Sequence, residues 1–281
     1  MPATPEGPFI LNCGYDPPLY GTVAVIHIPH ASRCIPAEER AALCLSDVEL
    51  SAELLKMTDA YTDELFAVDT YLAPHFTFPI SRLVVDPERF VDDAVEPMAE
   101  RGMGVVYTRT ATGAPLRRHL DPETRDRLLA WYYRPHHHQL DLAVSNILQQ
   151  GPSCLVVDAH SFPSIPLPYE FDQSRDRPDI CIGTADFHSP PALVDFAVEL
   201  CEQAGFRVAV NRPFAGAMVP ARYYKLDRRV MALMIEVNRR LYMDEATGER
   251  GPAFADVAVT VQSIVTSLVA YGVVRKDATC Q

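Results

Sequence analysis

Two histidines and a glutamate stand at the ends of three short apolar segments. His30 closes segment 23–30, His160 closes segment 154–160, and Glu236 closes segment 231–236. Short apolar runs of this kind are typical of buried strands in a parallel sheet. In open α/β sheets, chemistry gathers beyond the carboxyl ends of the strands. Two imidazoles and a carboxylate that meet there indicate a metal site with a base beside it.

A hydrolytic zinc site needs one more ligand than the two histidines supply. Such a site takes three protein ligands, from imidazole nitrogen and carboxylate oxygen, and leaves one position for water. Asp59 and Asp63 are the candidates, because they lie four residues apart in a helical pattern and therefore share one helix face. The alternative for both aspartates is a solvated helix face. For His30 and His160 it is a hydrogen-bonded place in the core.

Glu236 lies in an otherwise apolar segment, where a carboxylate is costly unless it is paired or functional. Arg239 or Arg82 could neutralise it. The functional interpretation is a general base that takes a proton from metal-activated water, with a pKa tuned by burial. Asp158 precedes His160 by two residues, so it shares a strand face with His160 and could orient a metal ligand.

Arg82 and Arg89 lie close together in segment 81–90. Planar guanidinium groups bind carboxylates in bidentate fashion, so two of them near a metal would suit a substrate with free carboxylates. The alternative is pairing with Asp86 and Glu88 in the same segment. Further along, the loop 211–217 follows a strand, and its Gly216 could permit close backbone approach to a ligand or serve a turn.

The other histidines give weaker signals. Residues 136–138 are three consecutive histidines in a helical segment, and consecutive side chains on a helix point in different directions. They therefore cannot bind one ion together, and we expect surface or supporting positions for them. Core hydrogen bonding is the expectation for four more: His27, His75, His119 and His188.

Apolar and helical patterns alternate along the chain. Strands are expected at 23–28, 76–80, 83–85, 154–158, 180–183, 207–210 and 231–237, and helices at about 47–67, 122–149, 190–204 and 254–272. Asp121 with Pro122 favours a helix start, Ser189 could cap the next helix, and Gly205 favours its end. Alternation of this kind predicts a mainly parallel sheet with helices on both faces, in the α/β class.

Composition limits the classes of protein to consider. The chain has 281 residues with 48% hydrophobic content and no visible linker, so we expect one domain over 1–281. The net charge of −12 without a basic patch argues against nucleic acid as a partner. Seven cysteines without a C-x-x-C pair, and an N-terminus unlike a signal peptide, favour the reducing cytoplasm. Segment 254–274 carries polar residues, so we expect a packed amphipathic helix and no membrane.

Other catalytic schemes have little support. The sequence has no G-x-S-x-G elbow and no P-loop, and Gly102-Met103-Gly104 is an isolated fragment of a glycine-rich motif. The order of elements shows no internal repeat.

Six motifs together resemble the N-formylglutamate amidohydrolase family, and they run in order through most of the chain. They are PHAS at 29–32, DAYTDEL at 59–65, SRLVVD at 81–86, DAHSFP at 158–163, NRPFAG at 211–216 and IEVNRRLYM at 235–243. The resemblance implies a three-layer α/β/α sandwich with a mixed, mainly parallel sheet, similar to that of zinc carboxypeptidases.

The resemblance also implies roles for individual residues. His30, Asp59 and His160 would hold zinc or another divalent metal, with Asp63 as the alternative to Asp59. Glu236 would be the general base. The substrate would contact Arg82, Arg89 and Asn211. Two positions depart from the family pattern, since Glu88-Arg89 stands where Asn-Arg is usual and His30-Ala31-Ser32 where His-Ser-Gly is usual.

The resulting prediction is a cytoplasmic, metal-dependent amidohydrolase. It would cleave an N-acyl amino acid, with N-formyl-L-glutamate as the leading substrate and histidine degradation as its setting. Two alternatives remain open at this point: a metallo-carboxypeptidase-like peptidase, and a non-catalytic module that binds acyl amino acids. The sequence leaves the oligomeric state undetermined.

Overall fold

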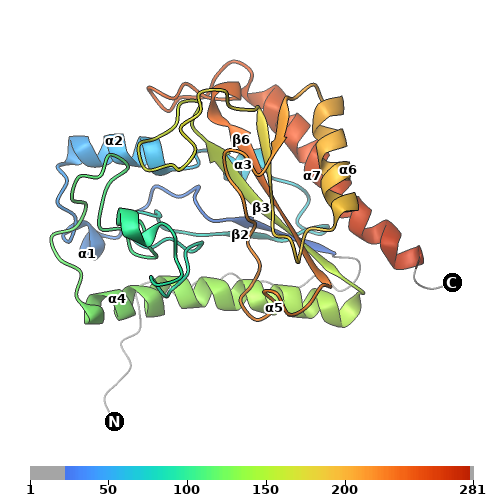
Figure 1. Cartoon of the computed structure of the whole chain (residues 1–281), viewed down its shortest axis with the longest axis horizontal. Helices are drawn as coiled ribbons and strands as arrows, with labels where there is room; N and C mark the ends of the chain where they lie inside the picture. The colour runs from blue at the N-terminus through green and yellow to red at the C-terminus, as the bar shows by residue number, and fades with distance from the viewer. Residues whose placement is uncertain (1–22, 279–281) are drawn as a thin grey trace, which may run out of the picture.

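The fold is built around one twisted sheet with helices on both sides (Figure 1). The computed structural model describes residues 23–278, and side chains as far as Tyr271. The strands are β1 (Ala24–Ile28), β2 (His75–Thr77), β3 (Cys154–Phe162), β4 (Ile180–Thr184), β5 (Val208–Val210) and β6 (Val230–Asn238). The helices are α1 (Ala37–Arg40), α2 (Asp47–Met57), α3 (Thr62–Leu65), η1 (Ala99–Arg101), α4 (Pro122–Leu128), η2 (Leu129–Tyr133), α5 (Arg134–Gln150), α6 (Pro191–Gln203), η3 (Arg239–Leu241) and α7 (Phe254–Ala278).

The sheet is mixed and mainly parallel, which confirms the predicted class. Its six strands run in the order β2-β1-β3-β6-β4-β5, and only the β4–β6 pairing is antiparallel. The two longest strands, β3 and β6, lie side by side at its centre, with His160 opposite Glu236. The carboxyl ends of β1, β3 and β6 therefore meet at one edge.

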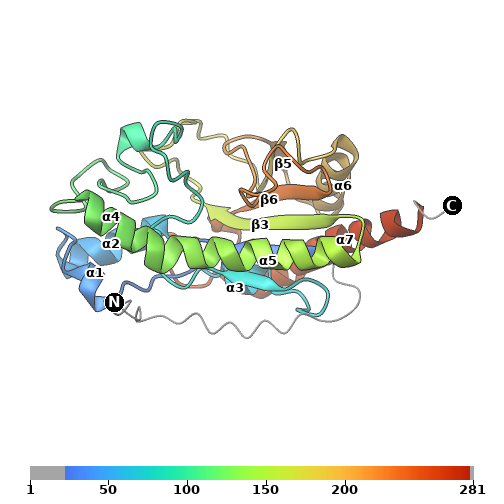
Figure 2. The same cartoon turned by 90° about the horizontal axis from the view of Figure 1, so that it is seen from below.

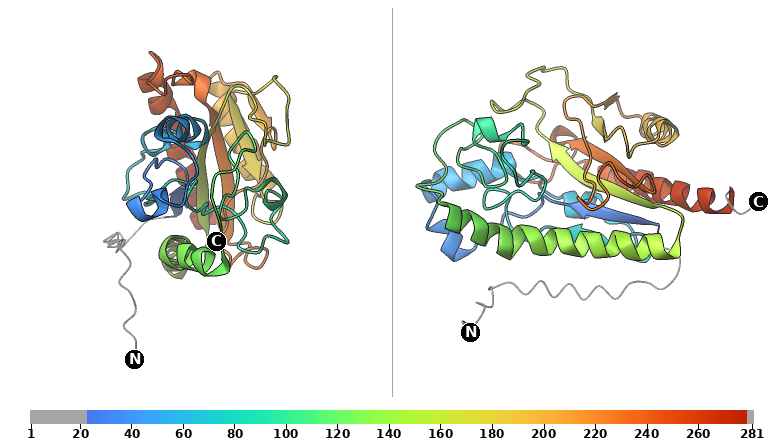
Figure 3. Two further views of the ribbon diagram at one scale, coloured as in Figure 1. Left: turned by 90° about the vertical axis from the view of Figure 1, so that its left-hand side faces the viewer. Right: turned by 60° about the horizontal axis from the view of Figure 1, so that its bottom comes forward.

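Each face of the sheet packs against different helices (Figure 2 and Figure 3). One face buries Val25, Val156 and Ala232 against α5. The opposite face buries the alternate residues, among them Ile26 and Val157, against α3, α6 and α7. Alternate side chains of a strand point to opposite faces, so apolar residues at every position of a strand require cover on both sides. These layers confirm the three-layer α/β/α prediction, and the comparison with zinc carboxypeptidases stays a prediction.

The long helix predicted at 47–67 is wrong in one respect, because the chain breaks it. A capping box between Ser46 and Glu49 starts α2, which ends at Met57. Tyr61 then takes a left-handed conformation with φ of 66°, and α3 begins at Thr62. Asp59 lies in the break, and its backbone N–H donates to the carbonyl of His30 at 3.0 Å. Asp59 and Asp63 therefore do not share a helix face.

The strand predicted at 83–85 is also wrong, since this segment forms a turn. The buried side chain of Arg117 donates to the carbonyls of Leu83 and Val84 at 2.7 and 2.6 Å. A side chain thus provides the hydrogen bonds that a neighbouring strand would otherwise supply. The turn leads directly into the segment that carries Asp86 and Glu88.

The helix predicted at 122–149 is confirmed as a continuous rod of α4, η2 and α5, in which η2 is one π-helical turn. The side chain of Asp121 accepts a hydrogen bond from the backbone of Thr124 and caps the start. Ser189 does not cap α6, because its hydroxyl donates to the carbonyl of Ala232 on β6. Gly205 follows α6 with φ of 86°, as a C-terminal glycine should.

Helix α7 is long and apolar enough, in residues Phe254–Tyr271, to cross a membrane by length and composition alone. In this structure it lies along the sheet and buries Val261, Val265 and Leu268 in the core. The five cysteines in the described part of the chain are free thiols. Cys13, Cys280 and the N-terminal segment judged unlike a signal peptide lie outside the described residues.

Candidate functional site

A row of polar side chains continues the apolar rows on the α5 face of the sheet. Along β1, Val25 is followed on the same face by His27. Along β3, Val156 is followed by Asp158 and His160, and Glu236 of β6 lies opposite His160. All four polar residues are at least 93% buried. The strands therefore change from core to functional site as they approach their carboxyl ends.

His30 follows β1, and a hydrogen bond from its Nε2 fixes the imidazole ring. Its Nε2 donates to Asp86 Oδ1 at 2.8 Å in a fully buried contact. Its Nδ1 faces two carboxylates, with Asp59 Oδ2 at 3.6 Å and Glu88 Oε2 at 3.8 Å. This Nδ1 is buried and makes no hydrogen bond. The carboxylate on Nε2 fixes the ring so that Nδ1 is free to bind a ligand.

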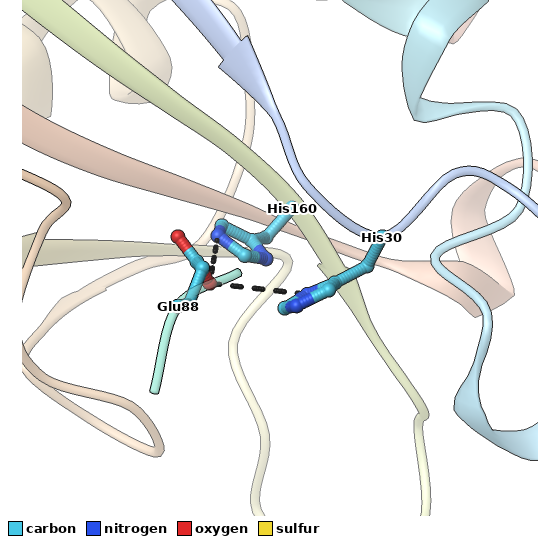
Figure 4. Close-up of side chains that lie close together, drawn as sticks. All are labelled: His30, Glu88 and His160. Carbon is cyan, nitrogen blue, oxygen red and sulfur yellow. Dashed lines mark ion pairs between the residues drawn. The ribbon is translucent and has the colours of Figure 1, made fainter. Parts of the chain in front are cut away.

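Both ring nitrogens of His160 lie near carboxylates, and Figure 4 shows Glu88 beside Nε2. Its Nδ1 lies 3.0 Å from Asp59 Oδ2. Its Nε2 lies 3.0 Å from Glu88 Oε2 and 3.2 Å from Asp158 Oδ1. Burial opposes the charged ring, but the charges of Glu88 and Asp158 hold the pKa of His160 well above its usual range. Without a bound cation, the ring would carry the positive charge that these carboxylates require.

Asp59 presents its two oxygens to different partners. Arg239 donates to Oδ1 at 2.9 Å, which neutralises the carboxylate. Oδ2 is left for the Nδ1 atoms of His30 and His160. Although burial favours the neutral acid, the hydrogen bond from His160, the nearby ring of His30 and the charge of Arg239 lower the pKa of Asp59. Asp63 is exposed at the surface, and it belongs to neither of the two groups of clustered ligand atoms found among the described residues.

The donor set fits a divalent cation. His30, Glu88 and His160 offer three ligand atoms within 4.8 Å of one another, as do His27, Glu88 and Asp158. The Oδ2 of Asp59 adds a third carboxylate at 3.0 to 3.6 Å from the histidines. Ligand atoms about 2 Å from a tetrahedral zinc ion lie about 3.3 Å apart. The orphaned Nδ1 of His30, which faces the same Asp59 oxygen as Nδ1 of His160, is the kind of buried atom that a metal would satisfy.

Glu236 is buried beside His160 and has one oxygen, Oε2, without a hydrogen bond. Arg239 does not pair with it, because its guanidinium contacts Asp59 and Ser161. Burial raises the pKa of Glu236 to about 8. A carboxyl group whose pKa lies near neutral pH can both accept and return a proton.

Two of the three residues expected to contact the substrate, Arg82 and Asn211, already form hydrogen bonds within the protein. Arg82 donates to Asp86 Oδ2 at 2.8 Å and to the Tyr107 hydroxyl at 3.0 Å. Asn211 exchanges two hydrogen bonds with Thr184. Arg89 is freer, because its Nε makes no hydrogen bond and lies 3.8 Å from Asp86. Of the three, Arg89 has the most capacity left for a ligand.

The loop 211–217 crosses β4 closely at another glycine. A Cβ at Gly183 would meet the carbonyl of Gly216 at 2.4 Å, so β4 needs its glycine for the loop to pass. Gly216 itself has φ of 101°, and a Cβ placed on it would meet nothing within 4 Å, so it serves the turn. The loop then reaches the site, where the backbone N–H of Met218 donates to Asp158 Oδ2 at 2.8 Å.

Several site residues were missed or undervalued in the sequence. The sequence suggested Glu88 only as a pairing partner of the arginines and as a departure from the family pattern, and it suggested a core position for His27. His27 Nδ1 bonds to Asp158 at 2.9 Å, and its Nε2 lies 2.9 Å from Nε2 of His136. The period of two that places Asp158 with His160 on β3 could also have placed His27 on the same face through the row of β1. Nothing periodic marks Glu88, which lies in a turn.

The three consecutive histidines point in three directions, as predicted. His136 is buried against His27, and His137 donates from Nε2 to the carbonyl of Pro87 at 2.7 Å. His138 is exposed. The first two therefore support the site from α5 without entering one ligand set.

Known proteins resemble the chain over most of its length. A family model described as N-formylglutamate amidohydrolase matches residues 22–243. An N-formylglutamate deformylase of Pseudomonas putida is 28% identical over 260 residues, which cover 89% of this chain and 94% of the relative.

Two solved structures share the fold. An N-formylglutamate amidohydrolase from Ralstonia eutropha JMP134 matches with a TM-score of 0.74 at 23% identity, covering 90% of this chain and 95% of that one. A gene product of Agrobacterium tumefaciens matches with a TM-score of 0.63 at 18% identity, covering 91% and 94%. Because the family model spans most of the chain and its motifs surround the buried site, the protein is an amidohydrolase that belongs to the N-formylglutamate amidohydrolase family.

Proposed function

We propose that this protein is a metal-dependent hydrolase that cleaves the amide of an N-acyl amino acid, with N-formyl-L-glutamate converted to L-glutamate and formate. One observation carries the metal requirement: the buried Nδ1 of His30 has no hydrogen bond and faces the carboxylate that also contacts His160. The substrate rests on the family and on the name of the Pseudomonas putida relative. We also propose a cytoplasmic setting, in histidine degradation.

The proposed ligands are His30 Nδ1, Asp59 Oδ2 and His160 Nδ1. In this set both histidines would bind through Nδ1 and donate from Nε2 to a carboxylate, Asp86 for His30 and Glu88 or Asp158 for His160. Zinc suits two imidazoles and one carboxylate, and another divalent ion could serve. When bound, the ion would supply a Lewis acid that polarises the acyl carbonyl and lowers the pKa of water.

Glu236 is the proposed general base. It would take the proton from the attacking water on its unpartnered Oε2 and later donate it to the nitrogen of the leaving amine. The raised pKa, about 8, suits both steps. Arg89 is the proposed contact to a substrate carboxylate, because its Nε is unpaired. Arg82 and Asn211 would first have to leave their present partners.

The proposal is tested first on Glu236. Metal-loaded wild type is expected to hydrolyse N-formylglutamate, whereas Glu236→Gln should keep the metal and lose turnover by about 100-fold or more, the scale of a lost general base. Unchanged turnover in Glu236→Gln would remove Glu236 from this role.

The substrate is tested with a panel that adds formylaspartate, acetylglutamate and a short peptide. Faster cleavage of the peptide than of N-formylglutamate would favour the peptidase alternative. A protein that binds these compounds without cleaving them would be a binding module.

The ligand set is tested by metal content. His30→Ala, Asp59→Asn and His160→Ala are each expected to weaken binding of the ion that supports turnover. Asp63→Asn is the matched control for Asp59→Asn, since Asp63 is exposed four residues away, and it should behave as wild type. If Asp59→Asn kept full metal affinity and activity, Asp59 would not be a ligand.

A further inference from the structure

A second group of ligand atoms lies beside the first and uses none of its three proposed ligands. It consists of His27, Glu88 and Asp158, each of which offers one ligand atom within 4.8 Å of the other two. His27 Nδ1 lies 2.9 Å from Asp158 Oδ1 and 3.6 Å from Glu88 Oε1. The side chains of His27 and Asp158 are at most 2% exposed, and that of Glu88 is 13% exposed.

The two carboxylates of this group lack a permanent cation. Asp59 pairs with Arg239, and Asp86 pairs with Arg82. Over residues 23–271, by contrast, neither Glu88 nor Asp158 pairs with an arginine or lysine, and their ion pairs are all with histidines. Two buried carboxylates side by side are unfavourable unless a positive charge of matching size lies between or beside them.

The surroundings hold each donor in place. The Oδ2 of Asp158 accepts the backbone N–H of Met218 at 2.8 Å, which leaves Oδ1 facing His27. His136 lies against Nε2 of His27, so His27 can keep its proton on Nε2 and offer Nδ1. A histidine ligand usually has such a partner on its other nitrogen. Glu88 turns Oε2 toward His160 and Oε1 toward His27.

We propose that His27, Glu88 and Asp158 form a second divalent-cation site next to the one on His30, Asp59 and His160. Two carboxylates and one imidazole suit Mn²⁺, Co²⁺ or Zn²⁺. The second cation would neutralise Glu88 and Asp158, and so reduce the repulsion that these carboxylates would exert on an anionic substrate. This inference depends on the proposed function only in taking His30, Asp59 and His160 as the ligands of the first cation.

The test is the metal stoichiometry of the full chain. Metal-free protein is equilibrated with Zn²⁺ or Mn²⁺ by dialysis, and bound metal is counted per chain. Wild type is expected to bind two ions, and His27→Gln and Asp158→Asn one. His75→Gln is the control, because His75 also lies on a strand of the sheet but outside both ligand groups, and it should keep two. Circular dichroism checks that each variant is folded.

Electron paramagnetic resonance of the Mn²⁺-loaded wild type gives an answer that requires no variant. Two neighbouring Mn²⁺ ions should produce a spin-coupled spectrum, whereas one isolated ion gives an uncoupled six-line spectrum. One ion per active chain with an uncoupled spectrum would overturn the second site and leave the proposed function intact. No bound ion in active wild type would overturn both. Loss of all metal in folded Glu88→Gln would assign Glu88 to the first ion instead.

Discussion

Asp86 connects three parts of the site through one carboxylate. It accepts hydrogen bonds from Nε2 of His30, from the guanidinium of Arg82, and from the backbone N–H of Glu88 at 2.9 Å. Its side chain is fully buried. Burial would favour the neutral acid, but the charges of Arg82, His30 and Arg89 keep the pKa of Asp86 well below its usual range. Asp86 therefore stays ionised and sets the orientation of His30.

We expect Asp86→Asn to weaken metal binding without removing a ligand. The neutral amide has only one oxygen and no negative charge. It therefore cannot accept hydrogen bonds from both His30 and Arg82 as the carboxylate does, and the ring of His30 loses its fixed orientation. Loss of such an outer partner typically weakens metal affinity by about 10- to 100-fold. Competition with a chelator of known affinity measures the change. Asp92→Asn, at an exposed position in the following loop, should leave the affinity unchanged; an equal effect in both variants would contradict the role of Asp86.

For individual site residues, the sequence predicts well only those that lie at the ends of strands. His30, His160 and Glu236 could be placed together because each terminates an apolar run, and such runs become parallel strands. Asp86 and Glu88 could not be placed, because they follow a turn whose Leu83 and Val84 carbonyls are held by the buried guanidinium of Arg117. A contact that depends on a side chain 33 and 34 residues away leaves no local pattern.

Helix α5 supports the turn that carries Glu88. His137, in the first turn of α5, donates from Nε2 to the carbonyl of Pro87 and stacks on Tyr133 with ring centroids 4.0 Å apart. Burial lowers the pKa of His137 to about 4. The ring is therefore neutral in the folded protein near neutral pH, whereas the unfolded chain takes up a proton below about 6.5.

This difference predicts a pH-dependent contribution to stability. Because the folded pKa lies below the unfolded one, the contribution is complete above pH 6.5 and is lost as the pH falls toward 4. The fall of the His137 pKa from 6.5 to about 4 corresponds to at most about 3.4 kcal/mol. Urea unfolding at fixed metal content, between pH 7.5 and 4.5, should show a shallower loss in His137→Gln than in wild type. The exposed His138→Gln should follow wild type; if His137→Gln did so too, His137 would not be the source.

The elements themselves were largely predictable, and the exceptions have tertiary causes. Regular apolar runs located β1, β3, β4 and β6 to within a few residues. The break between α2 and α3 was missed because it contains no glycine or proline. It forms where the backbone of Asp59 bonds to the carbonyl of His30, a contact between distant segments. Tertiary contacts of this kind override helical propensity.

Across the whole molecule, strand order determines which chemistry-bearing residues meet. The pairing of β1, β3 and β6 puts His27 opposite Asp158, and His160 opposite Glu236, on one face of the sheet. Alternating strands and helices predict a parallel sheet but leave its order open. The antiparallel pairing of β4 with β6 follows from long connections whose path the sequence does not encode locally. The fold class was therefore predictable, whereas the side-by-side placement of the ligands required the structure.

Removal of the metal should lower the stability of the whole fold, because the proposed ligands His30, Asp59 and His160 join the end of β1, the break between α2 and α3, and β3. A ligand that binds only the folded state at 100 times its Kd stabilises it by about 2.7 kcal/mol. For a chain of this size each kcal/mol moves Tm by about 2 to 4 °C, so chelation should lower Tm by roughly 5 to 10 °C. Calorimetry before and after dialysis against a chelator, with zinc added back, measures this. His138→Ala should show the same drop, since its ring is exposed, whereas His160→Ala should show little zinc response. A Tm that chelation leaves unchanged in metal-loaded wild type would contradict a metal bound at the junction of these segments.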